Sequence, residues 1–498
     1  MHADTPPSAR KTWLLLAGLV AFAAIVRLAN IGVPSLWGDE LYSVSFSRIP
    51  MDMLWGDWMV RETNPPLFYS ILKGWIALFG EQDTALRVLT IIVGLAAIGG
   101  IFLFVRALHS TQAALLAVAL AAVSSLQVAY SLEIRGYIFG ALFASLTLLA
   151  LVKLVDVWKS DDTSLRRQLP WLALYALGAA AAFHTHTTFA ILPVLANVAM
   201  AAIFFWRTPR ALAVALGWIA ANAVLLLLCL WWVMMTVQRL RDGAGPVNWI
   251  PEPTLKDVVA IMSHIVATRS FEFGNIVFGL LFGALMLWGA WRLTPERRIV
   301  VGVIGIGAPL LLVLVSLAQP VFLERTVFWL QFIYLGCIAV GLLSLPWKRW
   351  RLPAMAAAVV VLAADMLTWE LTAYREPWRD IARVLREQAT QRDVVLLYTA
   401  DAGVNLDHYC RLDGCGAAKW IALDEPTFNT VLPEYFRGDR VPREAMGGYI
   451  EAFDRVFVVR RRREDPTSAI NGHARLDQPN VLGKAYDDRV TLSVWKPE

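Results

Sequence analysis

The chain has 498 residues, of which 57% are hydrophobic and only 17% charged, with a mean hydropathy of +0.54 and a net charge of +5. Soluble domains carry about 25% charged residues, so this composition excludes an ordinary soluble protein and places most of the chain in lipid. Much of the Lys and Arg excess lies in short segments between apolar runs, where it sets membrane orientation, so we expect no nucleic-acid partner.

Apolar runs that can cross a bilayer recur along the chain, each needing about 20 residues. The first run follows Arg10 and Lys11 and resembles a signal peptide, but it is long for one and many runs follow it. We therefore interpret it as an uncleaved first helix. The pattern predicts about eleven spans, at 12–30, 84–106, 112–130, 136–155, 170–184, 187–206, 211–236, 275–293, 299–318, 326–345 and 353–370.

Basic residues indicate the orientation of these spans. With a cytoplasmic N-terminus, every inner connection is basic, whereas the short outer loops contain only Arg135 and Arg325. An odd number of spans then leaves the tail outside. We therefore predict a multi-pass protein of the bacterial inner (plasma) membrane, with a periplasmic or extracellular C-terminal domain. The inner basic residues are Arg10, Lys11, Arg106, Lys153, Lys159, Arg166, Arg167, Arg207, Arg210, Arg292, Arg297, Arg298, Lys348, Arg349 and Arg351.

Two outer connections, 31–83 and 237–274, are long. Both contain amphipathic stretches, at 66–79 and 255–266, which predict helices lying along the membrane surface. Long loops with their own structure are usually functional. We assign both loops to a transmembrane module, residues 1–375.

The tail, residues 376–498, changes character and predicts a small α/β domain. It has no phosphate-binding glycine fingerprint, so we assign it no nucleotide. Cys410 and Cys415 lie in this tail, where an oxidising compartment favours a disulfide over a metal site, since only His408 is close by. The expected elements are helices at 378–387 and 442–452 and strands at 393–398, 455–459 and 490–495.

Asp39 and Glu40 follow the first span and are flanked by apolar and aromatic residues. Partial desolvation raises the pKa of a carboxyl group in such a place, which suits a general base. The alternative is that the pair only caps the next helix. Farther along, the pair Pro65-Pro66 is a natural helix start, but helix initiation does not explain Asn64 and Tyr69, which are candidates to line a pocket.

A second group of charged residues is expected at the outer ends of the spans. Glu133 and Arg135 lie beside Tyr137, and a late span begins with Glu324-Arg325. Charges at membrane depth usually pair or serve a site, and a guanidinium suits phosphate oxygens. Each pair alone is explained equally by a structural ion pair, whereas the cluster is not. Arg27 and Arg87 fall at the same level.

His184 and His186 separate the fifth and sixth predicted spans at this same outer level. Together with Asp39 or Glu40 they are weak candidates for a divalent metal site, because two histidines at this spacing are common without a metal. No cofactor is otherwise expected.

Four motifs in this order resemble the membrane-embedded GT-C glycosyltransferases, in particular the group related to protein O-mannosyltransferases and the lipid A aminoarabinose transferase. They run along about 370 residues and are followed by a soluble outer domain that matches only in position and class. The motifs are Leu36-Trp-Gly-Asp-Glu40, Asn64-Pro-Pro-Leu-Phe-Tyr69, Glu133-Ile-Arg-Gly-Tyr137 and Phe322-Leu-Glu-Arg325.

The resemblance implies a sugar donor on a polyprenyl phosphate and an acceptor that is a glycan, a lipid or a protein. It implies Asp39 as the base that activates the acceptor hydroxyl, with inversion at the anomeric carbon. Arg135 and Arg325 would hold the lipid phosphate as charge builds on the leaving group. Many relatives have His or Lys before the Pro-Pro pair, where this chain has Asn64; Arg61 and Arg87 are the candidates to replace that cation.

The competing class is a polytopic transporter or lipid flippase, which places charges near the bilayer midplane and often has repeated halves. Here the charges gather at one interface and no internal repeat is visible. A phosphoethanolamine transferase would need a nucleophile and a metal cluster in the tail, where only His408, His473 and scattered Asp residues are available. A non-catalytic scaffold would leave the polar cluster unexplained.

Overall fold

The computed structural model describes residues 8–29, 31–207, 212–242, 250–271, 274–373, 376–398, 402–423, 438–461, 473–476 and 490–497. Backbone contacts divide the chain into two compact units. The bundle unit contains residues 1–29, 55–68 and 87–372, and the sheet unit contains residues 30–54, 69–86 and 373–498. The predicted boundary between residues 375 and 376 is not tested by this division and stays a prediction.

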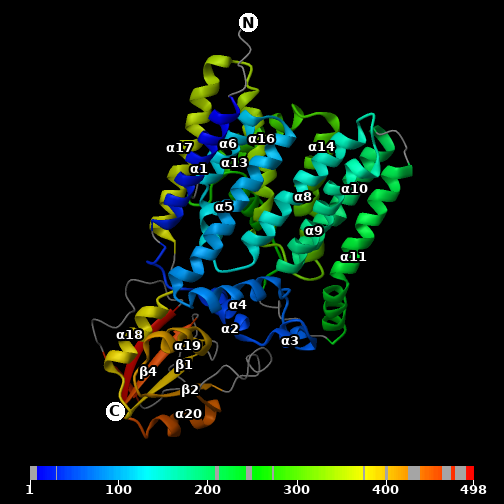
Figure 1. The fold of residues 1–498 in the computed structure, drawn as a ribbon. Helices are drawn as coiled ribbons and strands as arrows, with labels where there is room; N and C mark the ends of the chain where they lie inside the picture. Colours follow the sequence, from blue (N-terminus) through cyan, green and yellow to red (C-terminus); the bar gives the residue numbers. More distant parts are fainter. Residues whose placement is uncertain are drawn as a thin grey trace. The chain divides into compact units, whose positions relative to one another are not determined.

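The bundle unit is built from helices (Figure 1). Long neighbouring helices pack side by side, with α8 against α9 and α9 against α11. The elements are α1 Ala9–Leu28, η1 Asp57–Arg61, α5 Asp83–Leu108 (from residue 87), α6 Thr111–Ala122, α7 Ser125–Leu132, α8 Tyr137–Trp158, α9 Leu165–Thr185, η2 Thr187–Ala190, α10 Ile191–Arg207, α11 Leu212–Arg241, α12 Leu255–Val266, α13 Gly274–Trp291, α14 Pro295–Ser316, α15 Glu324–Val327, η3 Phe328–Leu330, α16 Gln331–Leu343 and α17 Lys348–Thr372.

Within the described part of the chain, nine helices are long and apolar enough to cross a membrane, and the pair α6 and α7 makes a tenth if it counts as one bent span. The prediction of about eleven spans is therefore one or two too many by this measure. The difference is the predicted span 170–184, which forms α9 but is diluted by Arg166, Arg167, Gln168 and His184. The protein is a multi-pass helical membrane protein.

The predicted span 112–130 is broken: α6 and α7 meet at a bend of 64°. Arg27 holds this break, because its Nη1 donates to the carbonyl of Ala122, the last residue of α6, at 3.4 Å and its Nε donates to Ser131 Oγ on α7 at 3.0 Å. Its side chain is fully buried. Arg27 is therefore a structural residue of the bundle unit, not part of an exposed cationic pocket.

Asp365 of α17 is the second buried charge at this break. Its Oδ2 accepts from Ser125 Oγ in the first turn of α7, and its Oδ1 accepts from the backbone N–H groups of Arg269 and Ser270 at 2.9 and 2.8 Å. A buried carboxylate needs such donors to offset its desolvation. Asp365 thereby joins the start of α7 to the second long loop just after α12.

The sheet unit combines residues 30–54 and 69–86, which hold most of the first long loop, with the tail. Its elements are α2 Gly38–Arg48, α3 Met51–Leu54, α4 Leu67–Phe79 (from residue 69), α18 Trp378–Gln388, β1 Asp393–Tyr398, α19 Ala402–Asp413, β2 Lys419–Leu423, β3 Asp439–Val441, α20 Arg443–Ile450, β4 Arg455–Arg461, β5 His473–Leu476 and β6 Val490–Pro497. Six elements predicted from the sequence are confirmed, within one or two residues at most termini. They are the amphipathic helices at 66–79, 255–266 and 378–387 and the strands at 393–398, 455–459 and 490–495.

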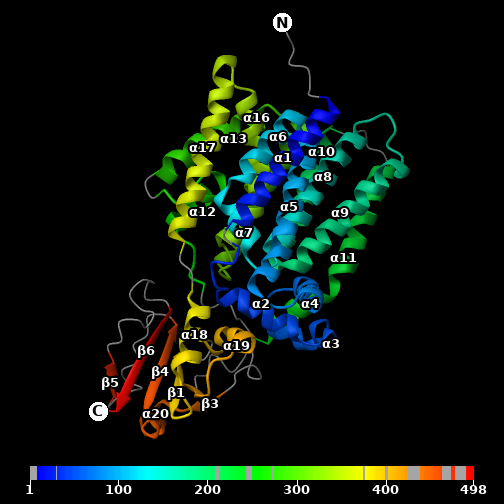
Figure 2. The ribbon, with the colours of Figure 1, turned by 60° about the vertical axis from the view of Figure 1, so that its left-hand side comes forward.

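The sheet has the order β3-β2-β1-β4-β6-β5. Strands β1 to β4 pair in parallel, and β6 joins β4 and β5 antiparallel. Strand β1 is buried along its whole length, which is the pattern of a central parallel strand. Helix α19 packs against α18 and contacts β1 and β4 (Figure 2). The strand order reverses between β1 and β4, so the carboxyl ends of these two strands form a topological switch point.

Candidate functional site

Asp39 and Glu40 lie in the first turn of α2, in the sheet unit. Carboxylates are favoured there by the helix dipole. The side chain of Glu40 is buried, and its Oε2 accepts from the N–H of Trp37, the N-cap residue, at 2.9 Å. The capping alternative therefore accounts for Glu40. Asp39, the residue before Glu40 in the same turn, is half-buried.

The segment before Asp39 is fastened to the tail within the sheet unit. The N–H of Leu36 donates to Tyr409 Oη at 2.7 Å, and the N–H of Gly38 donates to Glu376 Oε2 at 2.9 Å. Arg379 Nη1 donates to the carbonyl of Gly32 at 3.0 Å. Three tail side chains thus fix the backbone that leads into the first turn of α2.

Tyr69 has a packing role in the sheet unit. Its ring is 2% exposed and stacks on Phe46 of α2 with centroids 5.1 Å apart. This contact joins α4 to α2.

In the bundle unit, the motif at 133–137 approaches the connection between α9 and η2. Gly136 has no room for a side chain there, because a Cβ would lie 2.7 Å from the carbonyl oxygen of Thr185. This close approach places the Tyr137 ring 5.1 Å from the His186 ring, and the Arg135 guanidinium lies 5.5 Å from the centre of Tyr137. Glu133 is half-buried at the end of α7.

The pKa of His186 indicates that both predicted phosphate-binding arginines lie near its ring. Burial, and then the positive charges of Arg135 and Arg325, lower the pKa of His186 to about 3. The ring is therefore neutral. The N–H of Thr188 donates to His186 Nδ1 at 3.3 Å, which puts the proton of the neutral ring on Nε2. The structure thus brings Arg135, Tyr137, His186 and Arg325 together.

His184 is separated from this group in its contacts. Its Nε2 bonds to the carbonyl of Leu228 at 2.9 Å, and its ring lies 5.9 Å from that of Trp55. Across the described residues, no group of three or more His, Cys, Asp and Glu side chains has the arrangement of a metal site. His184 and His186 therefore have separate environments within the bundle unit.

The segment that carries Asn64 is held by α11. Arg239 Nε donates to the carbonyl of Val60 at 3.0 Å. Glu62 Oε1 accepts from the backbone N–H and from the side-chain Nδ2 of Asn64, at 2.9 and 2.8 Å. Of the two proposed replacement cations, Arg87 is buried in α5, and the side chain of Arg61 lies outside the described part of the chain.

Sequence reasoning missed the partners of Glu324. His264 Nδ1 lies 3.0 Å from Glu324 Oε2, and Arg269 Nη2 and Tyr130 Oη lie 3.4 and 3.3 Å from Glu324 Oε1. Glu324 therefore ties α12 and the loop after it to the short helix that carries the half-buried Arg325. His264 lies on the amphipathic stretch 255–266, but nothing in the sequence pattern paired it with a residue 60 positions away.

Residues 63–233 match the family model of dolichyl-phosphate-mannose-protein mannosyltransferases. No curated protein matches the chain. The crystal structure of ArnT from Cupriavidus metallidurans in the apo state is similar with a TM-score of 0.65 and 15% identity, covering 98% of both chains. The chain has the fold of the GT-C glycosyltransferases.

Two other structures of GT-C glycosyltransferases are also similar to this chain in fold. The oligosaccharyltransferase of Archaeoglobus fulgidus in the apo form has a TM-score of 0.56 at 13% identity, over 82% of this chain and 65% of that one. The arabinofuranosyltransferase AftD from Mycobacteria has a TM-score of 0.51 at 15% identity, over 99% of this chain and 40% of that one. The similarity to ArnT covers 98% of this chain, so it extends beyond the four motifs and into the tail.

Proposed function

We propose that this GT-C protein transfers a sugar from a polyprenyl-phosphate donor to a glycan, lipid or protein acceptor on the outer face of the membrane. The observation that carries the proposal is the group of Arg135, Arg325 and neutral His186 in the bundle unit. Each guanidinium group has five N–H donors and the neutral imidazole has one, at Nε2. All of these donors suit phosphate oxygens. An ArnT structure bound to undecaprenyl phosphate has a TM-score of 0.64 to this chain, which supports a donor of this class.

The proposed reaction is a single displacement. Asp39 takes the proton from the acceptor hydroxyl, whose oxygen then forms a bond to the anomeric carbon. The bond between this carbon and the phosphate oxygen breaks, and its electron pair leaves with polyprenyl phosphate, so the anomeric configuration inverts. Arg135 and Arg325 stabilise the negative charge that grows on the leaving phosphate. Asp39 is chosen over Glu40 because Glu40 already caps α2.

The test is transfer activity in proteoliposomes. Purified wild type and an Asp39→Asn variant receive polyprenyl-phosphate sugars and an envelope extract, and release of polyprenyl phosphate and labelling of an acceptor are both measured. Loss of a general base costs about 10²- to 10⁴-fold in rate. We therefore expect wild type to react and Asp39→Asn to lose at least about a hundredfold in kcat.

Asp52→Asn is the matched control, because Asp52 is an exposed carboxylate in the same loop. It should keep the wild-type rate. An Asp39→Asn protein that is as active as wild type contradicts the base assignment. A wild type that turns over no donor contradicts the transferase and calls for lipid-flipping assays, as a transporter or flippase would require.

A further inference from the structure

The sheet unit uses the edge at which α/β domains usually bind ligands to hold a segment of its own chain. Ligands of open parallel sheets bind outside the carboxyl ends of the strands at the switch point, which here lies between β1 and β4. Arg461 is the last residue of β4. Its guanidinium lies against Gly38, so closely that a Cβ on Gly38 would collide with it.

Glu376 completes this contact. Its Oε2 accepts from the N–H of Gly38 at 2.9 Å and from Trp378 Nε1 at 2.6 Å, while its Oε1 lies 3.5 Å from Arg461 Nη2. The side chains of Glu376 and Arg461 are only 11% and 14% exposed. Hydrogen bonds to a charged, largely desolvated carboxylate are stronger than neutral ones, so this acceptor fixes the Gly38 amide firmly.

A second anchor lies two residues earlier. Tyr409 of α19 accepts the N–H of Leu36 at its Oη and donates the same hydroxyl to Asp83 Oδ2 at 2.9 Å. Burial raises the pKa of Tyr409, so the phenol keeps the proton that this donation needs. Helix α19 follows β1, so both strands of the switch point contribute one anchor through the residues at or after their carboxyl ends.

We infer that the C-terminal domain is a positioning device for Asp39, with Glu376 and Arg461 as positioning residues that fix the backbone one residue before it. This inference rests on the proposed function and deepens it. It also explains why the tail has no nucleotide fingerprint: the chain's own segment at Leu36–Gly38 occupies the edge where such a ligand would bind. A base must keep hydrogen-bond reach of the acceptor hydroxyl, so small displacements of α2 lower kcat.

The test uses full-length protein in proteoliposomes with Glu376→Ala, Gly38→Ala, Arg461→Ala and the double variant Gly38→Ala/Arg461→Ala. We expect Glu376→Ala and Gly38→Ala to lose about 10- to 100-fold in kcat with the donor KM unchanged, as misplacement of a reacting group does. Removing the Arg461 side chain makes room for the new Cβ. The double variant should therefore be no slower than Arg461→Ala alone, a non-additivity that general destabilisation does not produce.

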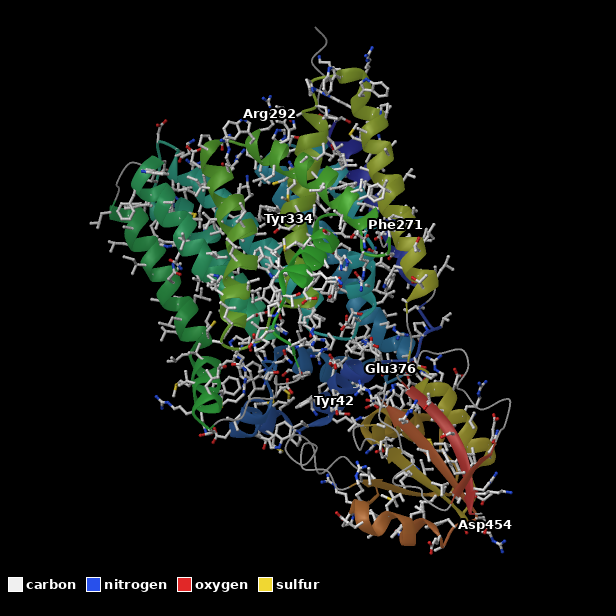
Figure 3. The ribbon with its side chains drawn as sticks, turned by 180° about the vertical axis from the view of Figure 1, so that it is seen from behind. Tyr42, Phe271, Arg292, Tyr334, Glu376 and Asp454 are labelled. Carbon is white, nitrogen blue, oxygen red and sulfur yellow. A yellow bond between two sulfur atoms is a disulfide. The ribbon has the colours of Figure 1, made fainter. Side chains whose placement is uncertain are left out.

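Arg455→Ala is the matched control on the same strand. Arg455 begins β4 and holds the buried carboxylate of Asp393 through bonds of 2.9 and 2.8 Å, so its loss destabilises the sheet without touching Gly38. The two ends of a seven-residue strand lie about 20 Å apart. Figure 3 shows Glu376 and Asp454, the residue before β4, at opposite ends of the β-sheet. Folded Arg455→Ala protein should keep the wild-type kcat.

Hydrogen exchange of the Leu36 and Gly38 amides gives a readout that does not depend on catalysis. Both amides should be protected in wild type, and Gly38 should lose protection in Glu376→Ala. An active wild type whose Glu376→Ala variant keeps its kcat, or whose Gly38 amide stays protected, overturns the positioning role and leaves the transferase standing. A wild type that transfers no sugar overturns the proposed function and the role in catalysis together, whatever the exchange shows.

Discussion

At the residue scale, His186 lies close enough to Arg135 and Arg325 for their charges to lower its pKa. A neutral imidazole beside two arginines adds no charge, so the positive potential there comes from Arg135 and Arg325. The geometry of the guanidinium, and not only its charge, should then matter for the donor phosphate.

Arg135→Lys and Arg325→Lys test this point. Each keeps the positive charge but loses the planar fork that binds two phosphate oxygens, so we expect kcat/KM for the donor to fall about 10- to 100-fold in each. Steady-state kinetics with a polyprenyl-phosphate sugar measures the effect. Arg297→Lys is the control, because Arg297 pairs with Asp156 at 2.8 Å in the same unit. Wild-type kinetics in both test variants would exclude a phosphate-binding role.

The candidate site was predictable where its signal is local. A carboxylate pair after a span, and an arginine followed by glycine and tyrosine, are visible in a few consecutive residues. His264 and Arg269 were missed because their partner, Glu324, is more than 50 residues away and carries no matching pattern. The contacts of Arg27 with Ala122 and of Tyr69 with Phe46 were not predicted for the same reason, because they depend on tertiary packing.

At the element scale, the break between α6 and α7 depends on buried polar groups. The predicted span 112–130 contains neither Pro nor Gly, the usual causes of a sharp kink, so the sequence predicted one straight helix. The bend is instead stabilised by side chains from other helices, Arg27 and Asp365. Strands such as β1 were predictable because a continuous apolar run between turns needs no distant partner.

Arg27→Leu should destabilise the bundle unit. The substitution leaves the Ala122 carbonyl and Ser131 Oγ without the donor that binds them, and a buried polar group without a partner costs about 1–3 kcal/mol. We expect a lower melting temperature in detergent, measured by tryptophan fluorescence. Arg10→Leu is the control, since Arg10 is an exposed residue of the same helix. Equal melting temperatures for the two variants would mean that Arg27 does not hold the break.

At the scale of the whole molecule, α9 decides on which side of the membrane the tail lies. Eleven spans place the N-terminus and the tail on opposite sides, whereas ten place them on the same side. Helix α9 has 21 residues, so it is about 32 Å long and matches a bilayer core of about 30 Å. Its low hydropathy comes partly from Arg166 and Arg167 at its first turn, where long side chains reach the interface. We therefore propose that α9 spans and that the tail lies outside.

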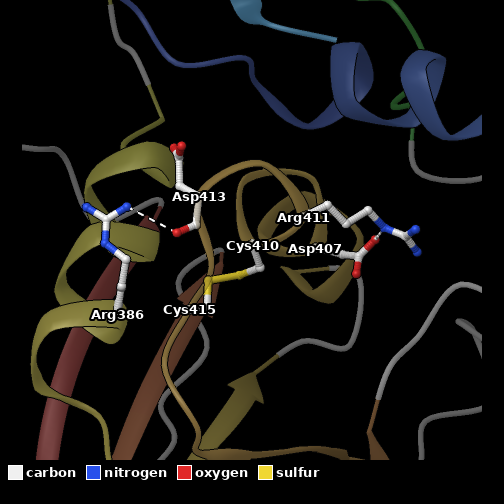
Figure 4. The surroundings of a disulfide bond; sticks show 6 residues. All are labelled: Arg386, Asp407, Cys410, Arg411, Asp413 and Cys415. Carbon is white, nitrogen blue, oxygen red and sulfur yellow. Dashed lines mark hydrogen bonds and ion pairs between the residues drawn. A yellow bond between two sulfur atoms is a disulfide. The ribbon is translucent and has the colours of Figure 1, made fainter. Parts of the chain in front are cut away.

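The cysteines provide the test. Cys410 and Cys415 form a disulfide at the end of α19 (Figure 4), which fits an oxidising compartment, whereas Cys229 and Cys337 are buried thiols. In intact spheroplasts, an impermeant maleimide should label wild type only after impermeant reductant is added. A Ser8→Cys variant lacking Cys410 and Cys415 should be labelled only after permeabilisation. Either labelling of Ser8→Cys in intact spheroplasts or labelling of the tail only after permeabilisation, without the other, would place both ends on one side and remove α9 from the spans. Both results together would keep α9 as a span and reverse the orientation.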